Sequence, residues 1–77
     1  MNPLESIWRK AKQGQLDPID LGGWTFSLYT KLGTGPCLCI CPTNIYLHPY
    51  IIGLDEIESP THLNLLMTMI KDDHDAP

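Results

Sequence analysis

The chain has 77 residues and a mass of 8.7 kDa, which is enough for one domain. Its hydrophobic content of 43% is typical of a globular domain and excludes a disordered chain. Five basic against nine acidic residues give a net charge of −4, and this excludes direct binding to nucleic acid, whose phosphates require clustered Lys and Arg.

Membrane contact is also not expected. No apolar run approaches the roughly 20 residues of a membrane span, and the first residues lack a basic region followed by an apolar stretch. Together with cysteines that are unsuited to pairing, this composition predicts a cytoplasmic protein. We expect a single α+β domain over residues 1–71 and a flexible acidic tail over residues 72–77.

The first element is a helix from about Pro3 to Gln13. Asn2 is a good N-cap, and proline suits the first helical position because its missing N–H costs nothing there. One apolar stripe follows at helical spacing: Leu4, Ile7, Trp8 and Ala11. Gly14 then favours a left-handed stop, and residues 14–23 are expected to form a connecting loop.

Three strands are expected next. Residues 24–31 alternate apolar and polar side chains, which is typical of a half-buried strand, and the glycines of residues 32–35 favour a hairpin. Residues 36–41 form the second strand, which is apolar on both faces and is therefore expected to be central in the sheet or covered on both sides. The third strand spans Ile45 to Ile52, with Pro49 forcing an edge position or a break.

The last helix is expected to be capped by Ser59 and to start at Pro60. Its apolar stripe consists of Leu63, Leu66, Met67 and Ile70, with Leu65 and Met69 just beside it. This wide face would suit either packing of the two helices together or contact with a second molecule. The expected order is α-β-β-β-α with a three-stranded antiparallel sheet, and the sequence leaves open whether the helices cover one face or both.

The three cysteines, Cys37, Cys39 and Cys41, are interpreted as buried free thiols. Residues two apart on a strand lie about 6.5–7 Å apart, at the limit for a disulfide. A structural metal site with His48 or His62 is the alternative, but this spacing spreads the sulfurs along a line and does not converge them on one ion. A catalytic thiol activated by His48 is a further alternative.

Sequence motifs for nucleotide binding, phosphate binding, zinc proteases and serine hydrolases are absent. We therefore expect no cofactor, no metal and no enzymatic activity. The sequence favours a small acidic interaction module, such as an inhibitor or adaptor encoded by a phage or mobile element, that occludes a site on a larger host protein. A Cys/His structural metal-binding domain is the alternative function, and a homodimer is the alternative assembly.

Two groups of residues are the candidate contacts with a protein partner. Tyrosine is enriched at interfaces because it combines an apolar ring with a polar tip, and acidic side chains can dock on a basic partner. The candidates are Tyr29, Tyr46, Tyr50, Asp55, Glu56 and Glu58. For the tyrosines, the rim of the core is an equally good interpretation. For the acidic residues, the simpler interpretation is a solvated segment before a helix.

Overall fold

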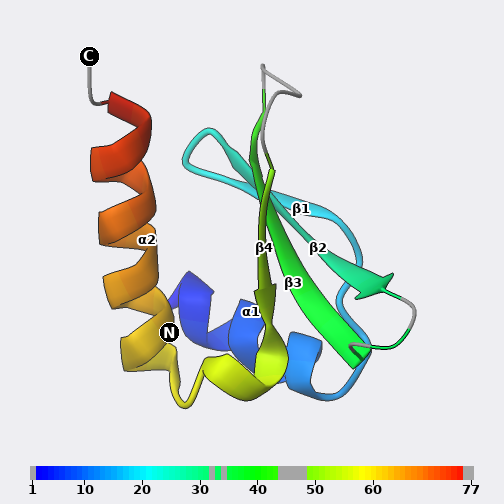
Figure 1. Ribbon diagram of the computed structural model, residues 1–77. Helices are drawn as coiled ribbons and strands as arrows, with labels where there is room; N and C mark the ends of the chain where they lie inside the picture. The colour runs from blue at the N-terminus through cyan, green and yellow to red at the C-terminus, as the bar shows by residue number, and fades with distance from the viewer. Residues whose placement is uncertain (1, 32, 34, 44–48, 76–77) are drawn as a thin grey trace.

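The computed structural model describes residues 2–31, 33, 35–43 and 49–75. The chain forms a helix, a four-stranded antiparallel sheet and a second helix (Figure 1). The elements are α1 (Pro3–Lys12), β1 (Ile19–Leu21), β2 (Trp24–Lys31), β3 (Gly35–Pro42), β4 (Tyr50–Gly53), a 3-10 turn (Leu54–Glu56) and α2 (Pro60–Asp75). The strands lie in the order β1-β2-β3-β4, so β1 and β4 are the two edges.

Both helices cover the same face of the sheet, here called the inner face (Figure 1). Trp24 and Phe26 of β2 point into it, as do Leu38 and Ile40 of β3, which pair in register with Leu28 and Phe26. These side chains form one core with residues of both helices: Ile7, Ala11, Leu63, Met67 and Ile70. The structure thus decides the placement of the helices that the sequence left open.

Helix α1 agrees with the prediction to within one residue at its C-terminal end. The Asn2 side chain accepts a hydrogen bond from the Leu4 N–H at 3.0 Å, which satisfies one of the unpaired N–H groups of the first turn. Gly14 follows the helix with a φ of 71°, the left-handed conformation expected of it.

The prediction of three strands is wrong, because β1 lies inside the segment expected to be a loop. Leu21 pairs with Trp24 across the two residues Gly22 and Gly23, whose φ angles are 60° and 86°. Two central residues with positive φ are the requirement of the tight hairpin turn whose twist matches that of the strands. The Gly-Gly pair was interpreted as part of a loop, although it connects two strands.

The third expected strand is shorter and shifted relative to the prediction. Strand β4 is Tyr50–Gly53, so it begins directly after Pro49. Proline cannot donate to a strand ladder, which explains a strand that starts after it. Residues 45–48 of the expected strand lie outside the described residues.

Helix α2 begins as predicted, with the Ser59 Oγ accepting a hydrogen bond from the His62 N–H at 3.2 Å. It continues to Asp75, so residues 72–75 of the expected tail are helical. The last turns are held by the Tyr50 hydroxyl, which donates to Asp73 Oδ2 at 2.8 Å, and by the ring of His74, whose centroid is 5.2 Å from that of Trp24. Over the part of the chain that the structure describes, neither helix is long and apolar enough to cross a membrane.

Candidate functional site

The face of the sheet opposite the helices, here called the open face, carries the side chains that alternate with those of the core. The register between strands places Thr25, Ser27 and Tyr29 opposite Cys41, Cys39 and Cys37. Cys39 in turn lies opposite Ile51 of β4. The open face therefore consists of Asp20, Thr25, Ser27, Tyr29, Cys37, Cys39, Cys41 and Ile51.

Two large side chains on the open face are well exposed, Tyr29 at 44% and Ile51 at 46%. Among the side chains described on this face, Asp20 is the one charged group, and its Oδ1 accepts a hydrogen bond of 2.6 Å from the Thr25 hydroxyl. The solvent-facing side of a two-layer domain usually alternates polar residues with the buried ones. This side instead presents thiols, hydroxyls and two large hydrophobic groups.

Strand β3 is central in the sheet, which is one of the two expected alternatives. The other alternative, cover on both sides, is wrong, because the helices cover only one side of β3 (Figure 1). The sequence pattern could not show this, since three cysteines on one face resemble a second core face. Cys37 is buried as expected, at 6% exposure, but Cys39 and Cys41 are half-buried on the open face. All three are thiols that form no disulfide.

The environment of Cys39 keeps its thiol protonated. Burial raises the pKa of Cys39, the side chain of Ser27 partly offsets this by a hydrogen bond, and Cys41 adds to the increase. A catalytic cysteine needs the opposite shift, towards the thiolate. His48, the residue expected to activate a thiol, lies outside the described residues.

The described residues contain no group of three or more His, Cys, Asp or Glu side chains that could hold a metal ion. The cysteine side chains follow one another along β3, as the sequence spacing suggested. His62, the other expected ligand, lies at the start of α2, where its Nδ1 accepts a hydrogen bond from the Glu58 N–H at 3.2 Å. That helix packs on the inner face, away from the cysteines.

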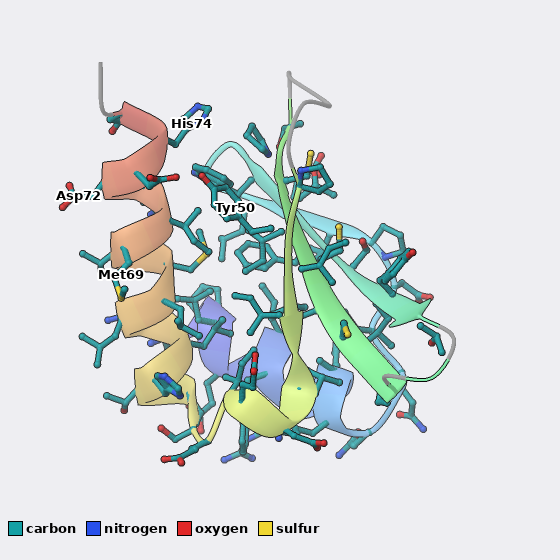
Figure 2. The ribbon with its side chains drawn as sticks, in the orientation of Figure 1. Tyr50, Met69, Asp72 and His74 are labelled. Carbon is teal, nitrogen blue, oxygen red and sulfur yellow. The ribbon has the colours of Figure 1, made fainter. Side chains whose placement is uncertain are left out.

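The structure separates the tyrosines that were expected to share a patch. Tyr29 is on the open face, whereas Tyr50 pairs with Ile40 and points to the inner side, towards the end of α2 (Figure 2). The hydrogen bond to Asp73 is the main reason why the pKa of Tyr50 is raised, because the neutral phenol is the donor. Tyr46 lies outside the described residues.

The acidic candidates lie at the same end of the sheet as Tyr29. Across the strands, Tyr29 is in register with Cys37, and Cys37 is in register with Gly53, which leads directly into the 3-10 turn. Asp55 and Glu56 are exposed on that turn, and Glu58 is exposed just after it. Two strand spacings place this turn roughly 10 Å from β2, and the three residues from Tyr50 to Gly53 place it at about the same distance from Tyr50. Tyr50, however, points to the inner side of the sheet.

The excess apolar surface expected on the last helix is present. Leu65 and Met69, one helical turn apart, are 58% and 65% exposed, and Met69 points away from the sheet (Figure 2). The residues of the expected stripe that are buried, Leu63, Met67 and Ile70, face the core. Both helices therefore pack on the sheet, and two large side chains remain in solvent.

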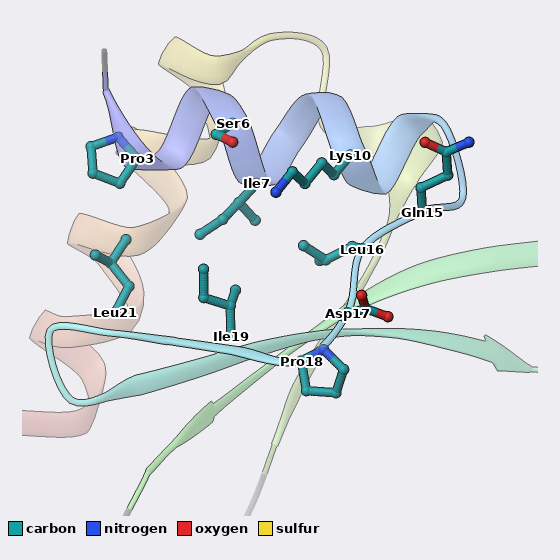
Figure 3. Close-up of a pocket in the computed structure, with 10 residues that line it drawn as sticks. All are labelled: Pro3, Ser6, Ile7, Lys10, Gln15, Leu16, Asp17, Pro18, Ile19 and Leu21. Carbon is teal, nitrogen blue, oxygen red and sulfur yellow. The ribbon is translucent and has the colours of Figure 1, made fainter.

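A pocket of about 310 Å³ that was not predicted from the sequence lies between α1 and β1 (Figure 3). Ile7 and Lys10 line it from α1, and Leu16, Ile19 and Leu21 line it from the segment that ends in β1. The signal in the sequence was the apolar alternation of Ile19 and Leu21 before the Gly-Gly turn. Because that segment was interpreted as a loop, no pocket beside it was foreseen.

No protein-family model, curated protein or solved structure to which the chain was compared matches it.

Proposed function

We propose that this protein is a non-catalytic interaction module whose open face covers a site on a larger protein. The observation that carries the proposal is the exposure of Tyr29 and Ile51 on the sheet face that neither helix covers, where Asp20 is the one charged group among the described side chains. An exposed apolar patch with a polar surround is typical of a protein-binding surface. Large aromatic and aliphatic side chains supply most of the binding energy at such surfaces.

The distribution of charge supports a separate folded partner. The chain carries a net charge of −4, yet the described side chains of the open face include one charged group, which a threonine hydroxyl already binds. Asp55 and Glu56 are exposed on the turn that follows β4, at the same end of the sheet as Tyr29. A partner with an apolar centre and a basic rim would match this arrangement and would be steered towards it by the charges.

The mechanism is occlusion. A domain of this size can cover about 800 Å² of a partner, the usual area that each protein contributes to a stable complex. Small inhibitors and adaptors, including those of phages and mobile elements, have this size and carry no cofactor. On this proposal the cysteines provide a neutral surface between Tyr29 and Ile51, and no chemistry takes place on them.

The test is affinity capture with three versions of the full chain: wild type, Ile51→Lys and Leu65→Lys. Both variants place one positive charge at an exposed apolar position, on the open face and on α2 respectively. We expect one protein to be recovered with wild type and Leu65→Lys and to be lost with Ile51→Lys. Binding of that purified protein by calorimetry should repeat the same order.

Two results would contradict the proposal. The first is recovery of the same protein with wild type and Ile51→Lys, which would show that the open face is not the contact. The second is that no protein is recovered from extracts of several hosts. Light scattering on the same samples measures the alternative assembly, a homodimer.

A further inference from the structure

We propose that the groove between α1 and β1 binds an extended peptide segment, which adds to the edge of β1 as a further strand. This inference rests on the proposed function only in taking a protein as the ligand. It uses a different surface from the open face. The groove is the pocket that opens beside the edge of the sheet (Figure 3). Its lining includes the apolar residues Ile7, Leu16, Ile19 and Leu21 together with the charged residues Lys10 and Asp17.

The register of the β1–β2 hairpin shows which backbone groups are free for a peptide. In a hairpin with a two-residue turn, the residues that flank the turn exchange hydrogen bonds, here Leu21 and Trp24. The next pair, Asp20 and Thr25, is then a pair without hydrogen bonds. The N–H and C=O of Asp20 therefore point away from β2, towards the free edge of the sheet.

A contact on the other side of β2 supports this assignment. The Thr43 N–H donates to the Gly23 carbonyl at 2.9 Å, so the odd-numbered residue Gly23 faces β3. Backbone groups alternate along a strand. The even-numbered residues Trp24 and Phe26 consequently bond towards β1 through Leu21 and Ile19, and Asp20 is left with its backbone facing outward.

The pocket lies where an added strand would place its side chains. A residue opposite Asp20 shares its face, the open face, and its two neighbours project to the inner side, next to Ile19 and Leu21. Both of these residues line the pocket, and Ile19 is 42% exposed. With a volume of about 310 Å³, the pocket is at the small end of ligand sites, which suits an aliphatic side chain better than a large ligand.

The charge at Asp20 disfavours pairing with the β1 strand of a second copy and favours a foreign segment as the occupant. Pairing of two β1 strands around Asp20 would set two carboxylates directly opposite each other on one face, and like charges in that position are destabilising. A basic or hydroxyl-bearing residue opposite Asp20 would be favoured instead. The expected segment is therefore extended and reads apolar, then basic or hydroxyl, then apolar, a form of strand addition.

The test uses the full chain labelled with ¹⁵N and a blocked heptapeptide with a central lysine between two leucines. We expect saturable shifts of the amide signals of Ile7, Ile19, Asp20 and Leu21. The control peptide carries an N-methyl group on the central residue, which removes the N–H that would pair with Asp20. Loss of this hydrogen bond should weaken binding about tenfold, and replacing the central lysine by aspartate should also weaken it.

A pair of variants tests the same contact from the protein side. Asp20→Pro removes the outward N–H, and proline is tolerated on an edge strand where the N–H faces solvent, whereas Asp20→Asn keeps that N–H. Binding of the lysine peptide should fall about tenfold for Asp20→Pro and only a few-fold for Asp20→Asn. Tyr29→Ala, on the open face, should leave it unchanged. If Asp20→Pro alters the fold, the N-methyl peptide on wild type decides alone.

Shifts confined to other regions, or equal affinity for the two peptides, would overturn the groove assignment. That outcome is distinguishable from failure of the proposed function. Loss of a captured partner with Ile51→Lys, without peptide binding at β1, would contradict the groove and leave the open face as the interaction surface. Peptide binding without any open-face partner would contradict the proposed function alone.

Discussion

On the inner face of the sheet, Leu38 and Ile40 are fully buried, whereas Tyr29 and Ile51 on the open face keep 44% and 46% of their surface in solvent. All four strands contribute side chains to both faces, so the difference comes from the helices. The inner side chains stabilise the fold because they are buried against α1 and α2. The exposed side chains of the open face remain available for contact with another protein. Substitutions on the inner face should therefore lower stability more than substitutions on the open face.

The largest effect should come from a cavity on the inner face. Ile40→Ala removes buried methyl groups among the core residues and should lower the free energy of unfolding by about 2–5 kcal/mol. That is a large part of the roughly 4–12 kcal/mol expected for a chain of this length. Denaturant unfolding followed by circular dichroism measures it.

The matched control is Cys39→Ala, the neighbouring residue of β3 on the open face. Since Cys39 is only half-buried, its truncation should cost less than about 1 kcal/mol. Equal losses for Ile40→Ala and Cys39→Ala would show that the two faces do not differ as described.

A smaller loss of stability is expected from a substitution in the turn of the β1–β2 hairpin. Gly23 has a φ of 86°, and a Cβ there would meet no atom within 4 Å, so Gly23→Ala introduces backbone strain without a clash. The cost should be about 1 kcal/mol. Gly53→Ala is the control, because Gly53 has a φ of −60° and an added Cβ would make only ordinary contacts. A thermal melt of both variants should separate them, and equal melting temperatures would contradict the assigned turn.

Thiol labelling sharpens the comparison within the open face itself. Cys37 is buried and should react with iodoacetamide only after unfolding, and the raised pKa of Cys39 should make its reaction at pH 7–8 slower than that of an ordinary thiol. Mass spectrometry of partly labelled protein measures the order. Fast labelling of Cys39 at pH 6–7 would instead indicate an activated thiolate.

The smallest effect concerns the end of α2 and depends on pH. The pKa of Tyr50 is raised in the folded protein, chiefly by its hydrogen bond to Asp73. Its contribution to stability is therefore fully present below the pKa of the unfolded chain and is lost as the pH rises through the folded pKa, above about pH 10. The protection of the amides of residues 72–75, measured as their exchange rate relative to that of an unfolded chain at the same pH, should fall there. Tyr50→Phe should lower this protection already at neutral pH.

Both helices could be predicted from the sequence because their ends carry strong local signals. Asn2 and Pro3 mark the start of α1, and Ser59 and Pro60 mark the start of α2. The end of α2 could not be predicted, because residues 72–75 are polar and their helical state accompanies contacts with Tyr50 and Trp24, which are distant in sequence. Local pattern does not contain such contacts.

The sheet was predicted less well for a similar reason. A strand of three residues such as β1 is too short for its alternation to stand out from a loop. Which faces of β3 are covered depends on where the two helices pack, and the sequence of β3 alone does not determine that placement. The pairing register places Tyr29 on the open face and Tyr50 on the inner face. A shift of the register by one residue would move each side chain to the opposite face.

Helix α1 is hydrogen-bonded to a segment that lies more than 40 residues later in the sequence. The Trp8 indole N–H donates to the Ile57 carbonyl at 3.1 Å, and the Lys12 ammonium donates to the Leu54 carbonyl at 2.6 Å. A nascent chain on the ribosome has both acceptors only once residue 57 has emerged. Helix α1 is therefore synthesised well before it can gain its final contacts, and its docking is completed only after residue 57 is available.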